Sequence, residues 1–150
     1  MAVMKVTCQW NEKMKFSATT PGLPGYKTEM DAKSPLGSDT AHTPKELVLA
    51  GICGCTAMDV VALLKKFKQP LEKLSVEAET ELTEGYPAVF KEVQLVFKFS
   101  GPMDSQKVLE SVMLSQTKYC GVSAMIAKAA PILYTVYLND SKIGDGRAKF

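Results

Sequence analysis

Apolar and polar residues alternate in several short stretches of this chain, with a period of two that is typical of β-strands with one buried face. Residues 4–10 and 14–18 alternate in this way. Residues 26–31 resume an extended pattern after a break that is rich in proline and glycine. We therefore expect three strands in the first part of the chain.

Three more strands are expected in the second part. Residues 74–82 and 93–99 alternate on either side of a Gly85-Tyr86-Pro87 turn, and this arrangement predicts an antiparallel hairpin. Residues 132–138 follow Pro131 and predict a closing strand.

Between these two groups of strands the pattern becomes that of a long helix. Thr43 can cap the helix, Pro44 suits its first position, and Glu46 stands three residues after Thr43, as in a capping box. Residues 47–64 are then apolar almost all round, and Asp59 is their only charge. A helix of this kind is buried on most of its sides, so we expect it at the centre of the fold.

Two shorter helical stretches lie between the hairpin and the last strand. Residues 103–118 show an amphipathic period, and residues 122–130 follow after the break at Gly121. The order of strands, buried helix, hairpin, broken helix and strand predicts an α+β fold. With no linker or repeat in the sequence, we expect one domain over residues 1–150.

The central helix also predicts self-association. A chain of 150 residues has few elements with which to cover a helix that is apolar on every side. A second copy of the chain would cover it, so we expect a homodimer with a shared core.

Charge and composition narrow the class of protein. The formal net charge is only +2, with 18 basic and 16 acidic residues, which argues against nucleic acid as a partner. No uninterrupted apolar run approaches the length of a membrane span, so we expect no transmembrane helix and no membrane partner. The N-terminal residues lack the apolar core of a signal peptide, which predicts a cytoplasmic protein whose four cysteines are thiols.

Two of the four cysteines are candidate functional residues. Cys55 lies in the apolar helix, and Cys120 lies in a polar stretch just before Gly121. If they meet in space they form a redox pair, and if they do not, the chain is a small soluble domain whose activity the sequence does not reveal. Cys53 and Cys8 fit apolar faces. Cys53 and Cys55 are about 200° apart around a helix, so they cannot bind one metal ion while that helix is intact.

Three stretches resemble one protein family. The central-helix signature of the OsmC/Ohr family (osmotically induced protein C and organic hydroperoxide resistance proteins) is similar to residues 43–47 with 51–61. Its second-cysteine motif is similar to residues 118–123, and its hairpin strand to residues 87–101. The resemblance extends over residues 34–138.

The resemblance implies a fold, a partner and an activity. It implies antiparallel sheets wrapped around long central helices in an intertwined homodimer, with active sites at the interface. It also implies a bacterial thiol peroxidase that reduces organic hydroperoxides or H₂O₂. In that reaction Cys55 would attack the peroxide and become a sulfenic acid, and Cys120 would resolve it as an intramolecular disulfide.

The same resemblance implies that an external dithiol reduces the disulfide and that neither a metal nor a flavin takes part. A lining suited to an alkyl hydroperoxide would come from four apolar residues, namely Ile52, Met58, Val122 and Met125.

The chain differs from the family pattern at the residues that activate the thiol. Peroxidases of the family use an arginine from an N-terminal strand, whereas the only arginine here is Arg147. The chain therefore resembles a branch that lacks the arginine. In the family, a carboxylate pairs with that arginine, and its position corresponds to Lys45 in this chain. Glu46, one position later, is therefore the remaining candidate for a functional carboxylate. Glu46 would sit roughly 13 Å along the helix from Cys55, so only the partner's copy could approach that thiol. His42 is a further candidate base.

Two functions from different classes follow from these observations. The first is a thiol-dependent hydroperoxide reductase. The alternative is a redox-responsive binding protein of the same fold, which holds an apolar ligand at the dimer interface without turnover. A third hypothesis, with less support, is a general thiol–disulfide exchange protein without specificity for peroxides.

Overall fold

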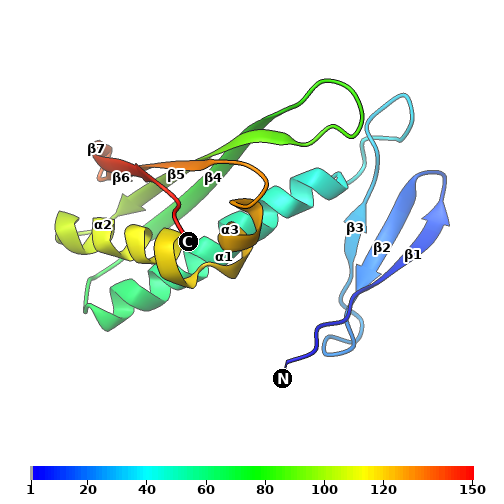
Figure 1. Ribbon diagram of the computed structural model, residues 1–150. Coiled ribbons are helices and arrows are strands. Elements are labelled where there is room, and N and C mark those ends of the chain that lie inside the picture. Colours follow the sequence, from blue (N-terminus) through cyan, green and yellow to red (C-terminus); the bar gives the residue numbers. More distant parts are fainter. Residues whose placement is uncertain (1) are drawn as a thin grey trace. The chain divides into compact units, whose positions relative to one another are not determined.

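The computed structural model describes residues 2–150 (Figure 1). The chain forms two compact units, of which the first ends at Val48 and the second comprises Leu49–Phe150. Helix α1 (Pro44–Lys66) begins in the first unit and continues into the second. Whether the units fold as one domain over residues 1–150, as the sequence predicts, stays a prediction.

The first unit holds a small antiparallel sheet. Strands β1 (Thr7–Glu12), β2 (Lys15–Thr19) and β3 (Thr28–Met30) pair in the order β1-β2-β3. The three predicted strands are confirmed with shifted ends.

The predicted burial of the first strand is wrong. Trp10 is 62% exposed and Cys8 is exposed, so Cys8 is not a core residue. Among its described residues the unit contains this sheet, its loops and the first turn of α1, and within the unit these give the apolar side of β1 no layer on which to pack.

A buried carboxylate organises the loop between β3 and α1. Asp31 accepts hydrogen bonds from the backbone N–H groups of Ala32, Ser38 and Thr40 and from the Thr40 hydroxyl, at 2.7–3.2 Å. The Thr40 hydroxyl is the largest of the causes that hold the pKa of Asp31 below its ordinary value of 3.8. Four donors thus depend on one ionised side chain.

We expect Asp31→Asn to lower the free energy of unfolding at neutral pH, since the amide cannot accept all four hydrogen bonds. Because the folded-state pKa is depressed, the contribution of Asp31 is full above pH 3.8 and is lost as the pH falls through the lower folded value. Urea unfolding of wild type and variant should therefore differ at neutral pH and converge in acid. Asp39→Asn, whose carboxylate is exposed and accepts one backbone hydrogen bond, is the matched control. A difference that is the same at both pH values would contradict this assignment.

The second unit is built on a four-stranded sheet. Strands β4 (Lys73–Leu82), β5 (Phe90–Ser100), β6 (Ile132–Leu138) and β7 (Ser141–Arg147) pair in the order β4-β5-β6-β7. The predicted β4–β5 hairpin is confirmed, with Val76 opposite Phe97.

The pairing of β5 with β6 corrects the expectation of antiparallel sheets, because these two strands are parallel. The segment between them passes through helices α2 (Ser105–Leu114), η1 (Ser115–Tyr119) and α3 (Gly121–Ile126). Such a crossover returns the chain to the same end of the sheet, so the next strand runs in the same direction.

Strand β7 was not predicted, because its sequence contains two glycines and little β-propensity. Asn139 and Asp140 both have positive φ, as a tight hairpin turn requires, and they join β6 to β7. A Cβ at Gly144 would press on the Leu109 side chain, and one at Gly146 on the Tyr134 side chain. The glycines therefore allow close packing within the sheet and against α2.

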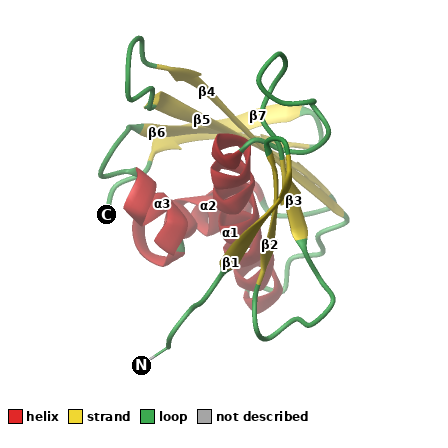
Figure 2. Cartoon of the chain, turned by 90° about the vertical axis from the view of Figure 1, so that its right-hand side faces the viewer, coloured by secondary structure: helices red, strands yellow, loops and turns green. Residues whose placement is uncertain are grey.

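The core lies between the sheet and the helices. Figures 1 and 2 show α1, α2 and α3 on the same face of the four-stranded sheet. Alternate residues of β5 and β6 are buried toward that face, in agreement with their predicted period of two. They meet Ile52, Val60 and Leu64 of α1 and Val108 and Val112 of α2.

Helix α1 begins as the sequence predicts. The Thr43 N–H donates to Glu46 Oε2 at 2.8 Å, and the Glu46 N–H donates to Thr43 Oγ1 at 3.3 Å, which is a complete capping box. The helix is buried on one face only. On the opposite face Val48 is 45% exposed, Met58 75% and Val61 44%.

Length and composition alone would allow α1 to cross a membrane, which corrects the exclusion based on uninterrupted apolar runs. The core helices of soluble proteins have the same composition. Because Ile52, Val60 and Leu64 are fully buried within the second unit, we interpret α1 as a core helix.

Candidate active site

The two cysteines singled out in the sequence meet in the second unit. The Sγ atoms of Cys55 and Cys120 and a carboxylate oxygen of Asp59 all lie within 4.8 Å of one another. Although the two cysteines are 65 positions apart in the sequence, the fold brings them together. Both are free thiols in the structure.

Helix α1 supplies two of these three groups. Cys55 and Asp59 are one turn apart, so their side chains lie on the same side of the helix. Both are half-buried, because this side of α1 borders its buried face. The cluster is therefore accessible from one side.

A local irregularity in the second helical stretch brings in the third group. After α2 the helix widens into the π-turn η1, where the Cys120 N–H donates to the Ser115 carbonyl at 2.9 Å. Cys120 then caps α3, and its Sγ accepts the Ser123 N–H at 3.3 Å. Ser115 and Cys120 are thus both turned into the interior, where each is fully buried.

Cys120 is held as a neutral thiol. Burial raises the pKa of Cys120 to about 11, hydrogen bonding from Ser123 opposes the rise, and the neighbouring Cys55 adds to it. Cys120 is thus buried and protonated at neutral pH, whereas Cys55 is the more accessible of the two thiols.

A chain of buried hydrogen bonds ends on Asp59. Gln116 Nε2 donates to Thr56 Oγ1 at 2.9 Å, the hydroxyls of Thr56 and Ser115 are 2.7 Å apart, and the Ser115 hydroxyl donates to Asp59 Oδ2 at 2.9 Å. The amide NH₂ can only donate, and the Ser115 hydroxyl directs its single hydrogen to Asp59, so Thr56 must donate to Ser115. The direction of every bond is fixed, and together they hold one oxygen of Asp59 in place.

Sequence reasoning missed Thr56, Ser115 and Gln116, which are all fully buried. A signal was available, because each is a polar residue on an otherwise apolar helical face close to a functional cysteine. Their partners, however, come from a different helix.

The other predicted residues lie outside the cluster. Glu46 is nine positions before Cys55 in α1. Its carboxylate accepts the Thr43 N–H and lies 3.4 Å from Lys33 Nζ and 3.8 Å from His42 Nδ1. The Thr43 hydrogen bond is the main cause that lowers the pKa of Glu46. Glu46 is therefore an ionised helix-capping residue, and its role toward a thiol stays a prediction.

Cys53, two positions before Cys55, does not join the cluster. It is half-buried, and burial raises its pKa. Its thiol is therefore a suitable reference for the reactivity of Cys55.

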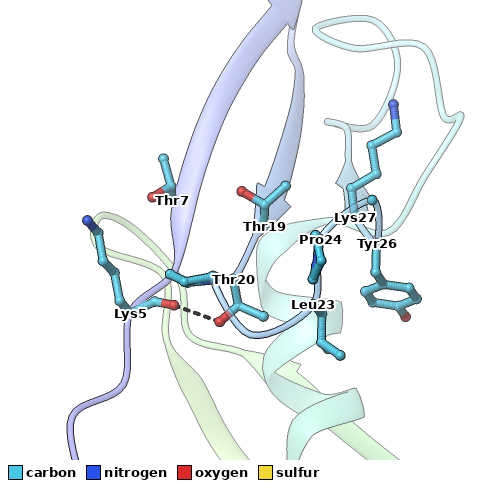
Figure 3. A pocket seen from close by; sticks show the side chains of 10 residues that line it. Lys5, Thr7, Thr19, Thr20, Leu23, Pro24, Tyr26 and Lys27 are labelled. Carbon is cyan, nitrogen blue, oxygen red and sulfur yellow. Dashed lines mark hydrogen bonds between the residues drawn. The ribbon is translucent and has the colours of Figure 1, made fainter.

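A separate pocket lies in the first unit and is shown in Figure 3. Threonine hydroxyls, two lysines and an apolar turn surround it, and the Thr20 hydroxyl donates to the Lys5 carbonyl at 2.9 Å. The lining residues are Lys5, Thr7, Thr19, Thr20, Pro21, Leu23, Pro24, Gly25, Tyr26 and Lys27. They include neither a thiol nor a carboxylate, so this pocket offers no nucleophile comparable to the cysteine pair.

Comparison with known proteins identifies the family. The model of the OsmC-like protein family matches residues 37–135, a range that includes both cysteines. The chain belongs to the OsmC-like family. Among its curated relatives is protein YhfA of Escherichia coli strain K12, which is 32% identical over 133 residues, or 88% of this chain and 96% of YhfA.

Solved structures agree on the fold. A hypothetical protein from Aquifex aeolicus VF5 superposes with a TM-score of 0.78 at 23% identity, over 93% of this chain and 99% of that one. An organic hydroperoxide resistance protein OsmC from Legionella pneumophila superposes with a TM-score of 0.70 at 19% identity, over 91% and 98%. The latter is also described as a predicted redox protein. The predicted α+β, OsmC-like fold is confirmed.

Proposed function

We propose that this OsmC-like protein is a thiol-dependent peroxidase that reduces organic hydroperoxides or H₂O₂. The observation that carries the proposal is the meeting of Cys55 and Cys120 in one cluster. Two free thiols at this separation can form a disulfide after a small adjustment, and that is the requirement of a two-cysteine peroxidase.

Burial supports the assignment of roles to the two thiols. Cys55 is half-buried and open to a substrate, so it is the thiol that attacks. Cys120 is fully buried and protonated, so it reacts only with a group already bonded to Cys55. Cys55 is therefore the peroxidatic cysteine and Cys120 the resolving one.

The reaction proceeds in three steps. The Cys55 thiolate attacks one oxygen of the hydroperoxide, the O–O bond breaks, and the alcohol leaves with a proton as Cys55 becomes a sulfenic acid. The Cys120 sulfur then attacks the sulfenic sulfur, water leaves, and a Cys55–Cys120 disulfide forms. An external dithiol finally reduces this disulfide and is itself oxidised to a disulfide. Hydroperoxide and dithiol are consumed, and alcohol, water and the oxidised dithiol are produced.

Exposed apolar side chains of the second unit are available to contact a substrate or a second copy of the chain. Met58 and Met125 are 75% and 67% exposed, so they are available to line a site for an alkyl hydroperoxide, while Ile52 is fully buried in the core. Val122 packs against the core as well.

The proposed compartment of the protein is the cytoplasm, where thiols stay reduced between turnovers.

The proposed assembly is a homodimer that covers the exposed face of α1. Gly51 and Gly54 lie on or beside this face. Apart from the two neighbouring residues and the nearby backbone of the helix itself, no atom of the described chain comes within 4 Å of a Cβ added at either position. Packing within one chain therefore does not explain these glycines. The close approach of a second helix does.

Peptide mapping after peroxide treatment tests the proposal directly. One equivalent of cumene hydroperoxide added to the reduced protein should remove two thiols per chain and give a single Cys55–Cys120 disulfide. In Cys120→Ser, the same treatment should leave a Cys55 sulfenic acid that dimedone traps. Oxidation that spreads over Cys8 and Cys53 without this disulfide would overturn the proposal.

A further inference from the structure

Besides two thiols, the cluster in the second unit contains a carboxylate that the proposed peroxidase reaction does not use. Two sulfurs and one oxygen lie within 4.8 Å of one another. Around a tetrahedral zinc ion, with Zn–S near 2.3 Å and Zn–O near 2.0–2.2 Å, ligand atoms are roughly 3.5–4 Å apart. The three donors are thus close to the separation that one ion requires.

The carboxylate is also oriented for a ligand. Ser115 donates to Asp59 Oδ2, and Ser115 is in turn held by Thr56 and Gln116. A carboxylate oxygen of Asp59 lies within 4.8 Å of both sulfurs, and a carboxylate that accepts one hydrogen bond keeps further lone pairs for a ligand. Outer partners that fix a ligand in this way are typical of metal sites, and here both hydroxyls of the network are fully buried.

A second feature supports sulfur ligation. The Ser123 N–H donates to Cys120 Sγ at 3.3 Å and so holds this sulfur in a fixed position. The two sulfurs come from different segments, α1 and the start of α3, so both can face one ion. The adjacent pair Cys53 and Cys55 cannot do so.

We propose that Cys55, Cys120 and Asp59 form a site for a thiophilic divalent cation, with Zn²⁺ as the best match. Two thiolates and one carboxylate make three protein ligands, and a water molecule would complete a tetrahedron on the accessible side of the cluster. This inference departs from the metal-free reaction that the resemblance to the OsmC/Ohr family implies.

Metal binding and peroxide chemistry would exclude each other. Both sulfurs give up their protons to solvent and bond to the ion, so neither is free to attack an O–O bond. Oxidation to the disulfide removes both sulfur ligands. The ion would therefore bind only the reduced protein and would protect its thiols. The proposal uses the same residues as the peroxidase reaction, but it does not depend on that activity.

Titration of the reduced, full-length protein with Co²⁺ tests the site, since cobalt thiolates have a ligand-to-metal charge-transfer band. We expect this band to saturate at one Co²⁺ per chain and to disappear when Zn²⁺ displaces the cobalt. Cys55→Ser, Cys120→Ser and the disulfide form should lose it. Cys53→Ser removes a thiol two positions away and should keep it.

Two further variants test the oxygen ligand and its support. Asp59→Asn should weaken Zn²⁺ binding by at least about tenfold in competition with a chromophoric chelator, and Ser115→Ala should weaken it by about 10- to 100-fold. Unchanged affinity in Asp59→Asn, or loss of the charge-transfer band in Cys53→Ser, would overturn the three-ligand site.

The same samples separate this proposal from the peroxidase. With a chelator present, the wild-type protein should form the Cys55–Cys120 disulfide with peroxide. A chain that forms the disulfide but gives no cobalt band overturns the metal site alone. A chain that gives the band but never forms the disulfide overturns the peroxidase alone and supports the metal site.

Discussion

Cys55→Ser is expected to reduce dithiol-dependent consumption of cumene hydroperoxide to the rate of the dithiol alone. Serine is similar in size, but its hydroxyl does not ionise near neutral pH and cannot be oxidised to a sulfenic acid. Because Cys55 is the accessible thiol of the cluster, no other group in it can take over the first step. The measurement is peroxide loss over time with dithiothreitol in excess.

Cys53→Ser is the matched control for this experiment. It makes the same chemical change two positions away, at a half-buried thiol outside the cluster, and should retain the wild-type rate. Full activity in Cys55→Ser would contradict the assignment of the nucleophile. Single oxidation of the wild type to the disulfide without turnover would instead favour the redox-responsive binding protein.

Met58→Glu is expected to convert a homodimer into monomers. Met58 is 75% exposed on the apolar face of α1, and a carboxylate there would have to lose its hydration inside the proposed interface. We expect the dimer dissociation constant to rise by about 100-fold or more, which corresponds to roughly 3 kcal/mol. Analytical ultracentrifugation at low micromolar concentration measures this shift.

Gln106→Glu adds the same charge at an exposed position in the first turn of α2, where the helix dipole favours it, and should leave the dimer intact. Circular dichroism of both variants separates a change of assembly from a loss of fold. A wild type that is already monomeric at these concentrations would contradict the proposed assembly.

The elements that the sequence predicted well are those whose signal is local. The capping box at Thr43 and Glu46, the length of α1 and the β4–β5 hairpin depend on residues within a few positions of one another. Strand β7 was missed because its glycines are explained only by contacts with Leu109 and Tyr134. The parallel pairing of β5 and β6 was missed because strand direction depends on the route of the crossover.

The candidate site divides in the same way. Cys55 and Cys120 stood out in the sequence by their neighbours and by the resemblance to the OsmC/Ohr family. The chain of hydrogen bonds from Gln116 through Thr56 and Ser115 to Asp59 could not be recognised in the sequence, because each bond joins residues 56 to 60 positions apart. No local pattern encodes such a network.

The sequence alone determined most of the helices and strands of this protein, because helical and strand periods and caps are properties of neighbouring residues. It also singled out both cysteines, by their neighbours and by the family resemblance. Only the tertiary structure decided that Cys55 and Cys120 meet, that Asp59 lies beside them, and that the π-turn after α2 turns Cys120 inward. The physical reason is that their proximity results from packing α1 and the crossover helices on one face of the sheet. That packing is fixed by the whole core and not by any short segment.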